Sequence, residues 1–282
     1  YLPLSPDGPI PETVPGAVLA LADKIDLLAG GFAAGLVPRG STDPYGLRRA
    51  AQGVTRILLS SVLDGAPGRI SLAKAIQASL TAYAAQKIPA TPAPGAAQTA
   101  ADFIAQRLRH LMEESGMRFD TARAVLAAGF DDVADAWRRA AALTLLRGAA
   151  GEADFLALAA SAKRIRNILA QAREKGVFTD GREVDASRLV DAEEIDLQQA
   201  VARVGAGLAG PIDAGDYTQA LKSIASLRPF VDRFFDKVLV MAPDEGLKAN
   251  RLALLSGLSH LLSKVADFSE IVVEGETAVK KG

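Results

Sequence analysis

Apolar residues recur every three to four positions along most of the chain, which is the spacing of one face of an α-helix. Glycine or proline interrupts this pattern at intervals, and Asp, Ser or Thr stands before most of the apolar runs, as expected at helix N-termini. The pattern predicts helices over 17–28, from Asp43 to near Gly65, from Ser71, over 99–116, 120–129, 131–148, 152–175 and 185–208, and from Asp216, Pro229 and Asp244, the last reaching Phe268. We therefore predict an all-α fold.

A Pro-rich stretch divides the predicted helices into two modules. Three prolines and a glycine occur between Pro89 and Gly95, and such a segment cannot continue a helix. We predict a first helical module over 1–88, a linker over 89–98, an irregular helical bundle over 99–274 and a disordered tail over 275–282.

Composition restricts the chemistry that is available. Alanine and leucine are abundant, which favours helix throughout. The 282 residues contain no cysteine, which excludes disulfides and thiolate ligands, and 32 basic side chains face 33 acidic ones, so a nucleic-acid partner would need a local basic surface. No signal peptide and no apolar run of membrane-spanning length is apparent, and we expect a cytoplasmic protein with no membrane partner.

No catalytic motif appears in the sequence. His110 and His260 lie in different predicted helices without a second histidine one turn away, and we interpret both as structural or surface residues. The glycine-rich stretch 30–35 follows a helix instead of joining a strand to a helix, so we interpret it as a helix stop and not as a phosphate-binding loop. We predict no catalytic residue, metal or cofactor in this chain.

Several segments, spread over nearly the whole chain, together resemble the β subunit of the bacterial heterotetrameric glycine–tRNA ligase. They are Tyr1-Leu2-Pro3, 15–26 (PGAVLALADKID), 40–51 (GSTDPYGLRRAA), 163–169 (KRIRNIL), 228–238 (RPFVDRFFDKV), 240–245 (VMAPDE) and 250–255 (NRLALL). Their order and spacing make the resemblance specific.

The resemblance implies a C-terminal portion of that subunit, which positions tRNA(Gly) through its anticodon region. The partner α subunit, a separate chain, would attach glycine with the help of ATP. The first module would be the end of an HD-like helical domain, and the second would resemble the anticodon-binding bundle of arginine–tRNA ligase. The alternative is a helical scaffold for subunit assembly that makes no direct contact with RNA.

Asp23 is the nearest approach to a metal ligand. The segment 21–26 is similar to a late helix of HD hydrolases that supplies an aspartate ligand, but the other ligands of such a site do not occur in this chain. We interpret Asp23 as a vestigial HD-type position; the alternative is an ordinary polar position on a half-buried helix.

The helix predicted over 152–175 carries the main candidates for tRNA binding. One side forms an apolar stripe, whereas Lys163, Arg166 and Asn167 lie on one flank with Arg173 at its edge. Arg164 points to the opposite side. Five basic residues and one acidic residue occur between positions 161 and 175. Such side chains can bind phosphates and read splayed bases, although a solvated helix face is the alternative.

The last helix offers a second set of tRNA-binding candidates, Lys248 and Asn250. The adjacent Arg251 falls on the apolar stripe, and we expect it to pair with Asp236 or Asp244. The phenylalanines near position 234 are expected to pack in the core more than to stack on bases.

Overall fold

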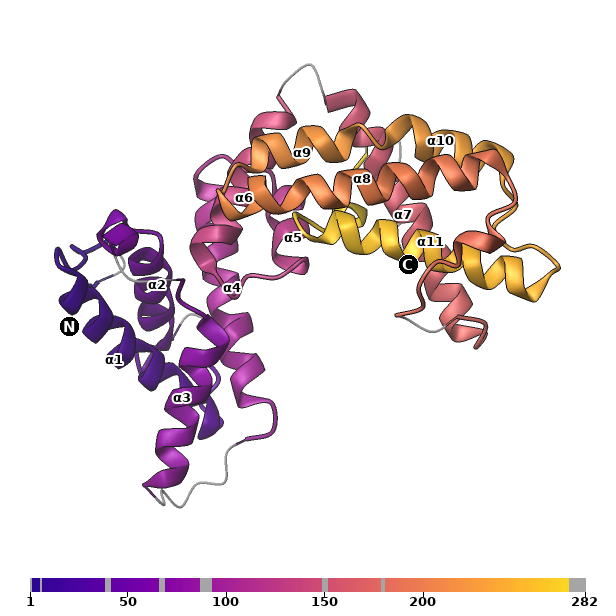
Figure 1. Ribbon diagram of the computed structural model, residues 1–282. Coiled ribbons are helices and arrows are strands. Elements are labelled where there is room, and N and C mark those ends of the chain that lie inside the picture. The colour runs from indigo at the N-terminus through magenta and orange to yellow at the C-terminus, as the bar shows by residue number, and fades with distance from the viewer. Residues whose placement is uncertain are drawn as a thin grey trace. The chain divides into compact units, whose positions relative to one another are not determined.

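The computed structural model describes residues 2–5, 7–38, 42–65, 69–86, 93–148, 152–178 and 181–273. Within these ranges the protein consists of helices, turns and loops without a β-strand, so the all-α prediction is confirmed (Figure 1). Residues 89–92 of the predicted linker and the predicted tail 275–282 lie outside the described ranges. The chain divides into two compact units.

Unit 1 comprises residues 1–116 together with 129–137. Its helices are α1 (Val14–Ala33), α2 (Leu47–Leu58), the 3₁₀ turn η1 (Ser61–Gly65), α3 (Leu72–Ala85) and α4 (Ala96–Glu114). Helix α1 packs against α2, α3 and α4, so it forms the centre of this unit. Large side chains such as Leu28 and Phe32 are buried there, and Phe32 meets the ring of Phe103 from α4 edge-on at 5.2 Å.

The position of α4 bears on the predicted domain boundary. Because α4 packs on α1, α2 and α3, unit 1 continues through Gly116 and does not end at the Pro-rich segment. The helix also begins earlier than its predicted start at Thr99. Gly95 in the left-handed conformation precedes Ala96, and its carbonyl accepts the Thr99 N–H at 2.9 Å, which is already a helical hydrogen bond.

The glycine pair Gly30-Gly31 lies inside α1, so the predicted helix stop at these residues is wrong. A Cβ on Gly30 would stand 2.5 Å from the Tyr83 hydroxyl of α3, and one on Gly31 would stand 3.0 Å from a methyl group of Leu47 of α2. The glycines therefore let two helices approach the α1 backbone closely. The helix ends two residues after Gly31, at Ala33.

Unit 2 comprises residues 117–128 and 138–282. Within the described ranges its elements are α5 (Phe119–Ala127), most of α6 (Val133–Leu146), α7 (Glu152–Glu174), η2 (Ala186–Arg188), α8 (Ala192–Asp213), α9 (Tyr217–Ala225), α10 (Arg228–Lys237), α11 (Glu245–Ser263) and η3 (Phe268–Glu270). Helix α8 packs against α9, α10 and α11, and α7 packs against α10, α11 and η3 (Figure 1).

Side-chain caps fix several helix starts where the sequence predicts them. Ser71, Asp216 and Asp244 each accept a backbone N–H from the first turn of α3, α9 and α11. Helix α8, in contrast, begins at Ala192 and not near Asp185. Asp191 forms a capping box with Glu194, whereas Asp185 caps the short turn η2.

Candidate nucleic-acid interface

Helix α7 buries the apolar stripe that the sequence predicts. Phe155, Leu158, Ala162, Ile165, Leu169 and Ala172 are all buried. Phe155 meets Phe268 of η3 edge-on, with 5.1 Å between ring centroids. This stripe anchors α7 against η3, α10 and α11, and thereby fixes which of its side chains face outward.

The outward side of α7 carries the predicted basic residues. Asn167, Arg166 and Arg173 are exposed, and Lys163 is partly exposed. Positions 166 and 167 follow Lys163 by three and four residues, so both lie on the same side of the helix as Lys163. Arg173 lies six residues after Asn167, and its guanidinium carbon stands 5.8 Å from the ring centre of Phe178. The structure thus brings Lys163, Arg166 and Asn167 together on one outward surface.

Arg166 belongs to an ion-pair network that the sequence does not reveal. Its Nη1 contacts one carboxylate oxygen of Glu270 at 2.5 Å, and Nε of Arg123 contacts the other at 2.7 Å. Arg123 also donates to the backbone carbonyl of Glu270 at 2.9 Å. Two guanidinium groups share one carboxylate, so the cluster keeps a net positive charge beside the α7 surface. Glu270 lies 104 positions after Arg166, and no local pattern links the two.

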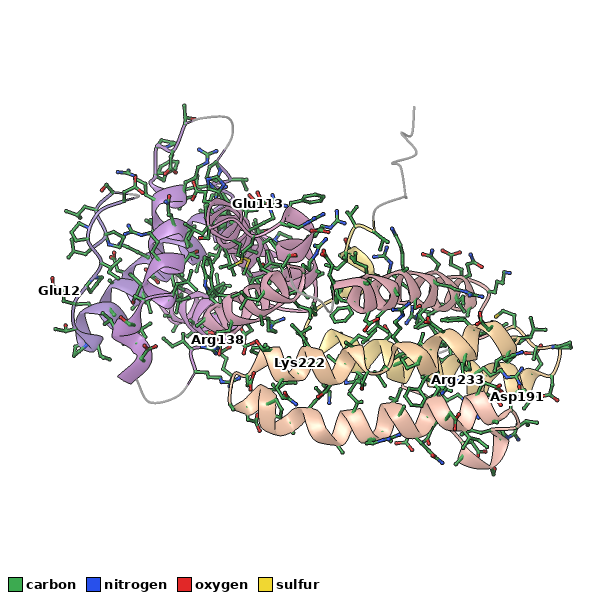
Figure 2. All side chains as sticks on the ribbon, turned by 90° about the horizontal axis from the view of Figure 1, so that it is seen from above. Glu12, Glu113, Arg138, Asp191, Lys222 and Arg233 are labelled. Atoms are coloured by element: carbon green, nitrogen blue, oxygen red, sulfur yellow. The ribbon has the colours of Figure 1, made fainter. Side chains whose placement is uncertain are left out.

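Arg164 lies on the α10 side of α7, away from Arg166 as predicted, but it has a structural contact there. Its guanidinium carbon stands 4.1 Å from the ring centre of Phe235. Within α10, the guanidinium carbon of Arg233 stands 5.0 Å from the ring centre of Phe230, and the side chain of Phe234 is fully buried. Figure 2 shows Arg233 and Asp191 toward one end of unit 2 and Lys222 toward the other. Partly buried rings and guanidinium groups therefore stabilise the packing along α10.

The candidates on α11 have structural partners in the fold. Asn250 is 1% exposed, and its amide both accepts the N–H of Asp185 at 2.8 Å and donates to the carbonyl of Asp185 at 3.0 Å. Asn250 therefore holds the segment before α8 and does not face outward, because both ends of its amide are used inside the protein. Lys248 is 13% exposed at the side chain and pairs with Glu245 at 2.7 Å.

Arg251 is structural, as predicted, but its acidic partners differ from the expected Asp236 and Asp244. It contacts Glu194 at 2.5 Å and Asp191 at 2.8 Å, both at the start of α8. The capping box at Asp191 places these two carboxylates side by side, which explains the choice of partners.

Hydrogen bonds connect the segment after α11 to α5 and to the residue that follows α6. Asp120 is fully buried, accepts from Arg147 at 2.6 Å and accepts the backbone N–H of Val272 at 2.9 Å. Burial alone would raise the pKa of Asp120, but the hydrogen bonds from Arg147 and Val272 and the charge of Arg147 outweigh it and lower this pKa below its ordinary value. The sequence pattern indicates only a helix start at Asp120, whereas in the structure its partners Arg147 and Val272 lie 27 and 152 positions further along the chain.

Asp23 lies on α1 and lines an open, mostly apolar groove between α1 and α3. The groove also contains Asp26, which accepts the Tyr83 hydroxyl at 2.8 Å, and Val18 and Leu19, which are about half exposed at 50% and 51%. Among the described residues, no group of three His, Asp or Glu side chains is placed to hold a metal ion. The described residues around Asp23 therefore do not fit the metal site of an HD hydrolase.

His110 is exposed, and its Nε2 lies 3.2 Å from a carboxylate oxygen of Glu114, one turn further along α4.

Within the described ranges, none of the helices combines the length and apolar character that crossing a bilayer requires.

Two family models match successive parts of the chain. Residues 1–127 match the family described as "Glycyl-tRNA synthetase beta subunit", and residues 158–272 match the "DALR anticodon binding domain". The chain belongs to the glycyl-tRNA synthetase β subunit family. The anticodon-binding match begins within α7 and ends just after η3, so it includes the outward α7 surface and Glu270.

Individual relatives carry the same name. The chain is 42% identical over 276 residues to the glycine–tRNA ligase β subunit of Acidobacterium capsulatum, 40% over 273 residues to that of Moorella thermoacetica, and 38% over 283 residues to that of Myxococcus xanthus. These alignments cover 96–99% of this chain but only 37–38% of each relative. The chain thus spans little more than a third of the length of these relatives.

Proposed function

We propose that this chain is the tRNA-binding portion of a glycine–tRNA ligase β subunit and that it positions tRNA(Gly) through contacts to the anticodon region. An α subunit would attach glycine with ATP in the same cytoplasmic enzyme. The observation that carries the proposal is the overlap between the anticodon-binding match at 158–272 and the outward basic surface of α7.

The charge of this surface supports RNA as the partner. Between positions 161 and 175 there are five basic residues and one acidic residue, in a chain whose net charge is -1. A local excess of this kind attracts phosphates even when the total charge is close to zero. We assign phosphate contact to Lys163 and Arg173, and base contact to Arg166 and Asn167, because amide and guanidinium groups can bond to base edges. Lys248 is a peripheral candidate.

The test is equilibrium binding of a glycine tRNA transcript and of a tRNA with another anticodon. We expect Lys163→Ala to weaken binding to both RNAs and to reduce the salt slope by about 1. Asn167→Ala should cost about 1–3 kcal/mol against the cognate tRNA, by analogy with base contacts to DNA, and much less against the other tRNA. Lys222→Ala, an exposed basic position on α9, is the matched control and should change little.

Arg166 needs a stability measurement beside the binding assay, because it pairs with Glu270. The pair is partly exposed, with 43% and 24% of the two side chains accessible, and pairs of this kind contribute about 0–1 kcal/mol. Arg166→Ala should therefore leave the protein folded while it weakens cognate tRNA binding. Unchanged tRNA affinity in a folded Lys163/Arg166/Asn167 triple-alanine variant would rule out this surface, and absence of any tRNA binding by the protein would favour the assembly scaffold.

A further inference from the structure

Exposed apolar side chains gather at one end of unit 2, the end that Asp191 marks in Figure 2. Within the described part of this unit, six large apolar side chains are exposed, and four of them lie at the start of α8 or between α10 and α11. We call these four the end patch: Val190 (66% exposed), Ile195 (38%), Leu239 (66%) and Met241 (40%). Isolated exposed apolar residues are ordinary, whereas a contiguous set marks a contact surface.

The buried side chain of Arg251 holds the two segments of the end patch together. Its Nη1 donates to the carbonyl of Leu239 at 2.9 Å, and its Nη2 donates to the carboxylate of Asp191 at 2.8 Å. One guanidinium group therefore contacts both segments. Leu239 and Val190, the neighbour of Asp191, thus project from adjacent pieces of backbone, and the end patch is contiguous.

The segment after α10 carries apolar side chains on both of its sides. Its inward residues, Val238, Val240 and Ala242, are each 6% exposed, whereas Leu239 and Met241 between them are exposed. A segment that alternates between buried and exposed positions ordinarily carries polar side chains on its exposed side. Within the part of unit 2 that the structure describes, the outward side of this segment therefore keeps apolar surface that is open to a second molecule.

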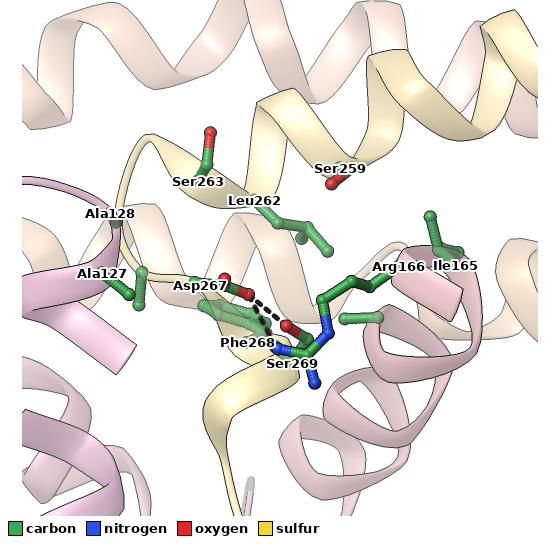
Figure 3. A pocket seen from close by; sticks show the side chains of 12 residues that line it. Ala127, Ala128, Ile165, Arg166, Ser259, Leu262, Ser263, Asp267, Phe268 and Ser269 are labelled. Atoms are coloured by element: carbon green, nitrogen blue, oxygen red, sulfur yellow. Dashed lines mark hydrogen bonds between the residues drawn. The ribbon is translucent and has the colours of Figure 1, made fainter. Parts of the chain in front are cut away.

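The end patch is separate from the basic surface of α7. Figure 3 shows Arg166 beside Ser269, near the last turn of α11, which ends at Ser263. The end patch adjoins the other end of α11, because Met241 precedes the N-cap Asp244 by three residues. Helix α11 has 19 residues, which corresponds to a length of about 28 Å. A ligand of the end patch therefore differs from the RNA that we propose for α7.

The charge around the end patch is opposite to that of the α7 surface. Six acidic and two basic residues occur between positions 182 and 196, and four of each occur between positions 232 and 251. Arg188, Arg233 and Lys248 already lie within 4 Å of a carboxylate, at 3.4, 3.8 and 2.7 Å. Among the described residues, Glu193 and Asp236 form no ion pair. This excess of negative charge repels phosphate groups and attracts lysine and arginine.

We propose that the end patch docks a helix of another protein, with apolar side chains on one face and lysine or arginine along the flanks of that face. The described residues contain no β-strand, so they offer no sheet edge to an extended peptide. The end patch contains no aromatic ring of the kind that holds Pro-rich segments. An amphipathic helix needs neither feature, and its basic flanks match the acidic segment at the start of α8.

The test uses a synthetic helical peptide of roughly 18 residues, or five turns, labelled with fluorescein. It carries leucines on one face, lysines on both flanks and alanines elsewhere. A second peptide has glutamate in place of lysine, and a third has the same composition with its leucines spread around the helix. Fluorescence anisotropy measures the binding of each peptide to the protein.

Leu239→Asp and Val190→Asp, singly and together, remove apolar surface from the end patch. Leu145→Asp in α6, whose side chain is 70% exposed, is the matched control outside the end patch. Each substitution adds a negative charge, which by itself strengthens attraction to lysine, so a loss of affinity reports the apolar contact. Circular dichroism and thermal unfolding check that the variants are folded.

We expect the double variant to bind the lysine peptide at least about tenfold more weakly than the unmodified protein, and Leu145→Asp to bind it equally well. The glutamate peptide and the peptide with spread leucines should each bind the unmodified protein at least about tenfold more weakly than the lysine peptide. Affinity for a glycine tRNA transcript should be the same in all folded variants.

Equal affinity of the lysine peptide for the folded double variant and the unmodified protein would overturn the proposal. Absence of binding to the unmodified protein, or equal binding of either control peptide, would also overturn it. A loss of tRNA affinity in Leu239→Asp but not in Leu145→Asp would assign the end patch to RNA instead of protein. These outcomes leave the test of tRNA binding by the α7 surface unaffected, because that test uses other variants.

Discussion

The Glu194 carboxylate of α8 accepts from Nε of Arg251 of α11 at 2.5 Å, inside the protein, where Glu194 is fully buried and Arg251 is 6% exposed. Glu194 also accepts the backbone N–H groups of Val190 and Asp191, at 2.8 and 2.9 Å. One side chain therefore completes the N-cap of α8 and pairs this helix with α11. The contact lies inside the anticodon-binding match, so the stability of that bundle depends on it.

We predict that Glu194→Ala destabilises unit 2 by about 3–5 kcal/mol, because it leaves the Arg251 charge buried without its main partner. Urea unfolding at pH 7 measures the change. Glu183→Ala, at an exposed position, is the control and should shift stability by no more than about 0.5 kcal/mol. Similar stabilities of the two variants would show that the buried pair contributes little.

Acid should destabilise the protein through Asp120 and Glu194. For Glu194, burial raises the pKa, but hydrogen bonds from Arg251 and from two backbone N–H groups outweigh this and lower the pKa, as Arg147 and Val272 do for Asp120. A carboxyl whose pKa is lower when folded binds fewer protons in the native state than in the unfolded state. Its stabilising contribution is complete above the ordinary values of 3.8 and 4.5 and is lost as the pH falls below them.

The measurement for this prediction is the free energy of unfolding between pH 7 and pH 3. Asp120→Asn should be less stable than the unmodified protein at pH 7, but it should lose less stability on acidification, because one titrating group is gone. Glu183→Gln should follow the unmodified curve. An unfolding free energy that stays constant down to pH 3 would contradict the prediction.

Two glycine substitutions within helices should act in opposite directions. Gly30→Ala places a methyl group 2.5 Å from the Tyr83 hydroxyl and forces that ring away from Asp26, so we predict a loss of about 1–3 kcal/mol. Gly207→Ala in α8 meets no atom within 4 Å and should stabilise the protein by about 0.5–1 kcal/mol through helix propensity. Thermal unfolding of both variants tests the pair; equal effects would show that α3 does not pack closely on α1.

Arg164 should contribute to stability and not to tRNA binding. Loss of its contact with the Phe235 ring in Arg164→Ala should cost about 0.5–1 kcal/mol. Phe235→Leu should remove the same interaction, so the double variant should be less destabilised than the sum of the two. Affinity for tRNA and its salt slope should stay unchanged. A fall in the affinity of Arg164→Ala for tRNA would show that the RNA-binding surface of α7 continues toward α10.

The sequence by itself determined two kinds of feature. The first depends on interactions between residues within about one helical turn, and the second is the resemblance to a known family. The period of the α7 stripe, the caps at Ser71, Asp216 and Asp244, and the all-α class follow from interactions between residues at most four positions apart. The resemblance to glycine–tRNA ligase β subunits rests on segments of the sequence itself, and the family model and the relatives confirm the resemblance.

Only the tertiary structure decided which polar residues face outward and which support the fold. Asn250 and Arg166 both lie in segments that contain several polar residues. Asn250 is nevertheless buried against Asp185, whereas Arg166 is exposed beside Glu270. Gly30 has the local signature of a helix stop, but the approach of Tyr83 gives it another role. These outcomes depend on side chains that are tens of residues apart and meet only when the helices pack, so no periodic pattern along the chain contains them.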